Sequence, residues 1–197
     1  MKKLVLATMV LFSLLSCNKD DDFAPLSQTE KDDLLTVREE EKLARDVYLY
    51  AFDKYALDIS NNISQSEQKH MDKILFLLNR YDLVDPASAT RGVFNNAELQ
   101  TLYNDLTAQV DISELEALKV GTTIEDLDIK DIEEFENRTD HSDILNVYSK
   151  LKCGSRNHMR AYYGQLMDNG FTYEAQFITS DALSAIIASS NEQCGRN

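Results

Sequence analysis

The chain has 197 residues, enough for one domain with a substantial core, and it contains only two prolines and six glycines. So few prolines and glycines argue against an all-β protein, and the abundance of Leu, Ala, Glu, Lys and Asp favours helices. The formal net charge of −14 would repel a phosphate backbone, which argues against a nucleic-acid partner.

Residues 1–17 are predicted to form a lipoprotein signal peptide. Lys2 and Lys3 precede an apolar run, LVLATMVLFSLL, that is too short to span a bilayer comfortably. The run ends in LLSC, which resembles the bacterial lipobox, whose cysteine receives lipid. The resemblance implies that several acyl chains on Cys17 anchor the protein to a membrane, whereas an ordinary cleaved signal with a chance cysteine is the alternative.

Residues 18–26 are predicted to be a tether between this anchor and the folded domain, residues 27–197. The tether begins with NKDDD, which resembles the tract of lysine and acids that sends lipoproteins of Bacteroidetes-type bacteria to the outer face. A merely solvated tether is the alternative. The resemblance implies a cell-envelope lipoprotein of the outer membrane that can be exposed at the surface.

Two long helices open the folded domain. SQTE at positions 27–30 has the form of a capping box and starts a helix that extends to about residue 55 or 56. A second helix spans roughly residues 60–81. In both helices the residues of a largely apolar stripe recur at alternating spacings of three and four, so that they share one continuous helix face.

A long connection and a short helix of roughly residues 96–109 come next. DISE at 111–114 resembles a helix cap and precedes a long helix over about residues 112–137. A further long helix is predicted over about residues 143–169.

Gly170 then stands where a C-terminal left-handed residue belongs. Residues 171–178 look extended, and Thr179 or Ser180 caps a short last helix that ends near residue 190. The predicted fold is therefore all-α: a ferritin-like four-helix bundle with a long second connection, residues 82–111, and a short C-terminal helix.

Each long helix interrupts its apolar stripe with residues of metal-binding type. These are Glu41, Glu67, His70, Glu125 and His158. The spacing of three between Glu67 and His70 places both on one helix face, so that one metal can bind both. A lone buried carboxylate is costly, and shared divalent cations would be the least costly way to bury this set. A buried Glu67–His70 ion pair and a core histidine at 158 are the alternatives.

Two of the helices contain motifs of a known family. EKLARDVY at 41–48 is similar to the first helix of rubrerythrin-type ferritin-like proteins, and EQKH at 67–70 matches their second-helix E-x-x-H. Together with GTTIEDLDIKD and GSRNHMRAY, these motifs resemble an uncharacterised ferritin-like family of exported bacterial and archaeal proteins over about residues 34–190. The resemblance implies a helical bundle with a dinuclear metal site.

The chain departs from the familiar di-iron pattern in its last long helix. Ser155 stands where a second E-x-x-H would have its glutamate, so that of this motif only His158 carries over. The remaining three glutamates and two histidines resemble the ligand set of manganese catalases. Asp128 could supply the missing oxygen, and the small residues Gly154 and Ser155 would leave space for water, peroxide or another ligand.

These features favour a pair of Fe or Mn ions with redox chemistry on peroxide, dioxygen or the metal itself. Glu41 and His70 would bind one ion, Glu125 and His158 the other, and Glu67 would bridge or chelate. The activity would be that of a di-metal oxidoreductase, peroxidase- or catalase-like or ferroxidase-like. A non-catalytic envelope binding or scaffold protein is the main alternative, and a buffer of Fe or Zn without turnover is a weaker one.

Cys153 and Cys194 form an even pair in a chain predicted to leave the cytoplasm, which suggests a disulfide. Two buried free thiols are the alternative.

Several neighbours of the metal-type residues receive a structural interpretation. Glu39 and Glu40 are interpreted as solvated, or as partners for Arg45, and Tyr48 as a packing residue. The acids that follow Glu125 in the run EDLDIKDIEEFE are mostly expected at the surface.

Overall fold

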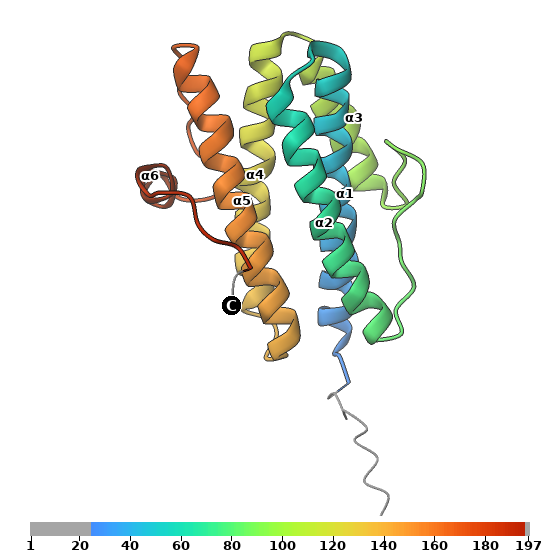
Figure 1. The fold of residues 1–197 in the computed structure, drawn as a ribbon. Helices are drawn as coiled ribbons and strands as arrows, with labels where there is room; N and C mark the ends of the chain where they lie inside the picture. The colour runs from blue at the N-terminus through green and yellow to red at the C-terminus, as the bar shows by residue number, and fades with distance from the viewer. Residues whose placement is uncertain (1–24, 196–197) are drawn as a thin grey trace, which may run out of the picture.

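The computed structural model describes residues 25–195, in which the chain forms six helices and no strand, so the prediction of an all-helical domain is confirmed (Figure 1). The predicted signal peptide, its Cys17 and the tether up to residue 24 lie outside the described residues. None of the helices in the described part is long and apolar enough to cross a membrane. The helices are α1 (Gln28–Tyr55), α2 (Asp58–Arg80), α3 (Ala97–Val110), α4 (Glu114–Glu136), α5 (Ser142–Asp168) and α6 (Ser180–Ala188).

The four long helices lie side by side, with α1 packed against α2 and α4 packed against α5 (Figure 1). In the sequence, the two pairs are joined by the connection after α2 and by the shorter α3, which together return the chain along the length of the molecule. Helix α3 lies against α1 and α4, whereas α6 lies against α5. The second connection therefore crosses the molecule as predicted.

The ends of the helices follow the predicted local signals with one exception. Ser27 Oγ accepts a hydrogen bond from the Glu30 N–H (3.2 Å) and the Glu30 carboxylate accepts one from the Ser27 N–H (2.8 Å), which confirms the capping box. Gly170 has the expected positive φ, 79°, after the end of α5. The exception is the start of α4, where Ser113 caps the helix and Asp111 instead follows the end of α3.

The connection between α2 and α3 is fixed to α1 by buried charged residues. The Arg38 guanidinium donates two hydrogen bonds to the Asp85 carboxylate, at 2.7 and 2.9 Å. Glu39 is buried and accepts a hydrogen bond from the Asn95 backbone N–H at 3.1 Å. The interpretation of Glu39 as a solvated residue is therefore wrong. The connection covers a face of α1 that lies outside the apolar stripe and would be exposed to solvent on an isolated helix.

Asp46 makes a second attachment from the same face of α1. Its buried carboxylate accepts hydrogen bonds from the Gly92 backbone N–H (2.9 Å) and from the equally buried Lys42 ammonium (2.6 Å). Arg45 donates to Asp46 and to Gln68, rather than to either of the glutamates predicted as its partner. Such buried pairs are costly to break, so these contacts hold the connection firmly.

The apolar core is divided into two clusters along the length of the molecule. On α1, Val37 belongs to one cluster and Ala44 to the other, and Glu41 lies between them. On α5, Leu151 and Met159 belong to different clusters in the same way. A polar layer therefore separates two apolar regions, and it contains the residues of metal-binding type.

Candidate metal centre

The structure brings all five predicted residues together, and each is at most 9% exposed. Nδ1 of His70 lies 2.7 Å from Oε2 of Glu67 and 3.2 Å from Oε2 of Glu41. Nδ1 of His158 lies 2.8 Å from Oε1 of Glu67 and 3.4 Å from Oε2 of Glu125. Glu67 therefore lies in the middle, with one carboxylate oxygen facing each imidazole.

The five side chains form two groups that share Glu67. One contains Glu41, Glu67 and His70, the other Glu67, Glu125 and His158, and within each group the candidate ligand atoms lie within 4.8 Å of one another. Two carboxylate oxygens and one imidazole nitrogen make a donor set that suits Fe, Mn or Zn.

Several atoms that face one another in this layer have no hydrogen-bond partner in the described part of the chain. They are Oε1 of Glu67, Oε2 of Glu125 and Nδ1 of His158. The His158 and Glu67 atoms are only 2.8 Å apart, yet they are not aligned as a hydrogen bond. Buried polar atoms are normally paired, and cations between these groups would satisfy them. The residues present therefore fit divalent metal ions.

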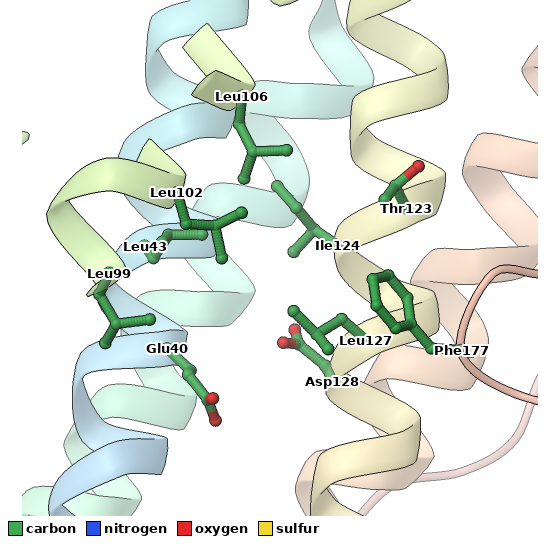
Figure 2. Close-up of a pocket in the computed structure, with 10 residues that line it drawn as sticks. All are labelled: Glu40, Leu43, Leu99, Leu102, Leu106, Thr123, Ile124, Leu127, Asp128 and Phe177. Carbon is green, nitrogen blue, oxygen red and sulfur yellow. The ribbon is translucent and has the colours of Figure 1, made fainter. Parts of the chain in front are cut away.

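Asp128 belongs to neither group. The suggestion that Asp128 supplies the missing oxygen is therefore not supported by the two groups, although the residue is buried. It lines a small cavity together with Glu40 (Figure 2). Asp126, in the part of the acid-rich run expected mostly at the surface, is buried as well. Glu40 is half-buried, so its interpretation as a solvated residue is also wrong. Burial raises the pKa of Glu40 to about 8 and the pKa of Asp128 well above its ordinary value, and the charge of Glu41 adds to both shifts.

The five clustered groups strongly influence one another's charge. Burial raises the pKa of Glu41 to about 7 and also raises that of Glu125. Burial opposes a charge on the imidazoles, but the adjacent carboxylates outweigh it and raise the pKa of His70 to about 9 and that of His158 well above its ordinary value. For Glu67, the imidazoles of His158 and His70 outweigh burial and lower its pKa. At neutral pH the imidazoles therefore hold protons that a bound cation would have to displace.

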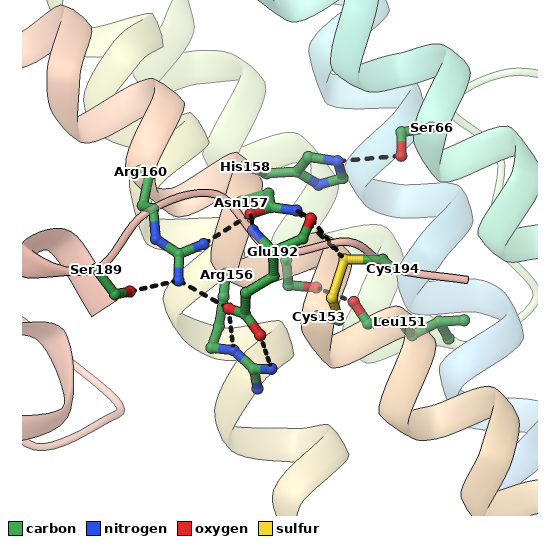
Figure 3. The surroundings of a disulfide bond; sticks show 11 residues. Ser66, Leu151, Cys153, Arg156, Asn157, His158, Arg160, Ser189, Glu192 and Cys194 are labelled. Atoms are coloured by element: carbon green, nitrogen blue, oxygen red, sulfur yellow. Dashed lines mark hydrogen bonds and ion pairs between the residues drawn. A yellow bond between two sulfur atoms is a disulfide. The ribbon is translucent and has the colours of Figure 1, made fainter. Parts of the chain in front are cut away.

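Two hydroxyl groups orient the residues of this layer. Nε2 of His158 donates a hydrogen bond to Ser66 Oγ at 3.0 Å, which leaves Nδ1 directed at the carboxylates (Figure 3). The Tyr48 hydroxyl donates to Oε1 of Glu125 at 2.5 Å, so Tyr48 does more than pack. Sequence reasoning missed Ser66, although its position directly before the E-x-x-H motif was a usable signal.

Gly154 provides room for an imidazole rather than for a small ligand. A Cβ atom at this position would lie 2.6 Å from Cε1 and Nε2 of the His70 ring. The neighbouring Ser155 hydroxyl donates to the Leu151 carbonyl at 3.2 Å. The predicted space for water or peroxide at these two residues is therefore wrong at Gly154, where the His70 ring fills it.

We expect Gly154→Ala to destabilise the fold by about 1–3 kcal/mol, because the new methyl group must displace the His70 ring. Gly164→Ala is the matched control, since it lies on the same helix and a Cβ there meets nothing within 4 Å. The control should gain up to about 1 kcal/mol from the better helix propensity of alanine. Urea unfolding of both variants measures the difference, and equal stabilities would contradict this role of Gly154.

The C-terminal tail is attached to the outer side of α5, next to this layer. Cys153 and Cys194 form a disulfide with their Cα atoms 5.6 Å apart (Figure 3). The Glu192 carboxylate accepts hydrogen bonds from the guanidinium groups of Arg156 and Arg160, and these arginines lower its pKa to about 2. The tail thus covers α5 on the side opposite to His158.

Comparison with known proteins shows similarity over nearly all of the helical part. The model of a family described as an uncharacterised protein domain, DUF2202, matches residues 30–190. Uncharacterised protein MJ0754 of Methanocaldococcus jannaschii is 49% identical over 170 residues, which are 86% of this chain and 92% of that protein. A crystal structure of hypothetical protein MJ0754 from Methanococcus jannaschii matches with a TM-score of 0.85 at 48% identity, over 86% of this chain and 98% of that chain.

Proposed function

The chain belongs to the DUF2202 family of uncharacterised domains, and we propose that it binds two Fe or Mn ions in a ferritin-like bundle and uses them for redox chemistry. One observation carries the proposal: three carboxylates and two imidazoles from four helices converge around Glu67, and several of their buried atoms have no hydrogen-bond partner among residues 25–195. Peroxide, dioxygen or the metal itself would be the substrate.

The arrangement of the helices supports the ferritin-like part of this proposal. Ferritin-like bundles join four long helices through one long crossover and place carboxylates and E-x-x-H histidines inward at one level. Here α1, α2, α4 and α5 are joined in this order through one long connection, and each contributes to the polar layer. The serine at position 155 is the departure from the di-iron pattern.

The roles of the residues follow from their positions. Glu67 would bridge the two ions, with Glu41 and His70 on one side and Glu125 and His158 on the other. Iron or manganese would supply changes of oxidation state when bound. Ser66 would hold His158 with Nδ1 inward, and the apolar clusters above and below would exclude bulk water.

We place this activity at the cell envelope, where the predicted lipid on Cys17 would hold the protein at the outer membrane. The Cys153–Cys194 disulfide is compatible with an oxidising compartment of this kind. The net charge of −14 disfavours a nucleic-acid partner.

Calorimetric titration of chelator-treated protein with Mn²⁺ tests the proposal, and we expect two ions per chain. Because protonated Glu41, with a pKa of about 7, and protonated His70, with a pKa of about 9, compete with the metal, affinity should rise with pH. Between pH 6 and pH 8 the expected gain is about tenfold per pH unit for each proton displaced.

Repeating the titration in buffers of different ionisation enthalpy measures the released protons. Binding of fewer than one ion per chain, or an affinity independent of pH, would contradict the metal centre and favour a scaffold protein without redox activity.

A further inference from the structure

A small cavity lies between α1, α3 and α4, on the outer side of the polar layer. Its volume is about 40 Å³, and five leucines from the three helices form most of its wall, with Phe177 at one side (Figure 2). Glu40 of α1 and Asp128 of α4 extend their carboxyl groups toward the space between these two helices.

Asp128 contributes a fully buried polar atom to this cavity that has no partner among the described residues. The residue is 7% exposed, and its Oδ2 atom is buried without a hydrogen bond to any described residue. Buried carboxyl oxygens are normally paired, so this atom calls for a hydrogen-bonding occupant of the cavity.

The size and the lining of the cavity restrict that occupant. One water molecule needs about 10–15 Å³ of such volume, so 40 Å³ accommodates a molecule of two or three heavy atoms. A divalent cation would lose its hydration shell against a wall of leucines, and in the described part of the chain Asp128 and Glu40 belong to no group of three converging ligands. A small uncharged molecule loses much less hydration free energy when it enters the cavity.

The cavity adjoins the helix segments that carry the metal-type residues. Asp128 follows Glu125 by three residues, about 4.5 Å along the axis of α4, and Glu40 directly precedes Glu41 on α1. We propose that this cavity is a docking site for small uncharged hydrogen-bond donors of the size of hydrogen peroxide, and that Oδ2 of Asp128 accepts their hydrogen bond. The purpose of the site, delivery of such a molecule to the metal centre, rests on the proposed function, but docking itself requires no metal.

Methanol is an unreactive probe of the right size. Because it has only two heavy atoms, its dissociation constant can be no tighter than about 10 mM. Titration of the full chain, labelled at leucine methyl groups and freed of metal by chelator, should give saturable NMR shifts at cavity leucines such as Leu43 and Leu127. Absence of saturable shifts there would overturn the proposal, whatever the outcome of the metal titration.

Four variants distinguish binding in the cavity from binding elsewhere on the protein. Leu102→Trp should fill the cavity and abolish the shifts, whereas the control Leu115→Trp, another half-buried leucine that does not line the cavity, should retain them. Asp128→Leu should weaken methanol binding at least tenfold but retain xenon binding, while Asp128→Asn, which keeps an acceptor, should bind methanol. Equal methanol affinity in Asp128→Leu and the parent chain would show a void without a specific hydrogen bond and overturn the role of Asp128.

In metal-loaded protein, Leu102→Trp should lower kcat/KM for peroxide at least tenfold while the metal content stays at two ions per chain. An unchanged kcat/KM would show that peroxide arrives by another route. Loss of metal from the parent chain would instead refute the proposed function and leave the methanol result intact.

Discussion

Glu67→Gln is expected to abolish the binding of both metal ions, whereas the loss of any other ligand should spare one of them. Glu67 is the residue that both candidate groups share, and its two oxygens face the two imidazoles at 2.7 and 2.8 Å. A glutamine of the same shape offers one neutral oxygen and one amide that would point donor hydrogens at a cation. Affinity should therefore fall by more than the roughly 10- to 100-fold that is typical for loss of an outer hydrogen-bond partner.

The measurement is metal content after dialysis, together with calorimetry. Glu41→Gln should retain about one ion, held by Glu67, Glu125 and His158, and the exposed Glu98→Gln on α3 should retain two. Circular dichroism should show the same helix content in all three variants. Two ions per chain in Glu67→Gln would rule out a bridging role for this residue.

The polar layer could be predicted from the sequence because its residues interrupt otherwise apolar helix faces. Glu41, Glu125 and His158 are far apart in the chain, but each occupies a stripe position, and a position on a stripe points toward the shared core. Helix number and approximate ends followed from the same periodicity and from local caps such as Ser27. Predictions from such local patterns hold when the apolar stripes face the core, as they do here.

The burial of residues outside the apolar stripes could not be predicted, because it depends on segments that are distant in sequence. Glu39 and Asp46 would lie in water on an isolated helix, but the connection after α2 covers them and uses them as acceptors. Asp126 shows the same effect on α4, where its buried carboxylate accepts hydrogen bonds from the Tyr173 hydroxyl (2.7 Å) and from the backbone N–H groups of residues 176–178. An acid-rich run thus contains both surface residues and the anchor of a loop, and only the tertiary contacts distinguish them.

Removal of the disulfide through the double substitution Cys153→Ser and Cys194→Ser is expected to lower the free energy of unfolding by about 4 kcal/mol. The bridge joins two residues separated by 41 positions in the sequence. Closing a loop of this size lowers the conformational entropy of the unfolded chain, which stabilises the folded state by about 4 kcal/mol. The melting temperature should fall by roughly 8–16 °C for a domain of this size. Chemical and thermal unfolding with and without reductant measure the effect.

The same double variant separates stability from metal binding. The tail contacts α5 from the outer side, through Arg156, Asn157 and Arg160, whereas His158 points inward to Glu67 and Glu125. Well below its melting temperature the variant should therefore still bind two ions, although it unfolds more easily. The parent chain in reductant should behave like the variant, and the variant itself should not respond to reductant. A loss of less than about 1 kcal/mol would contradict the prediction, because the bridge would then hardly restrict the unfolded chain.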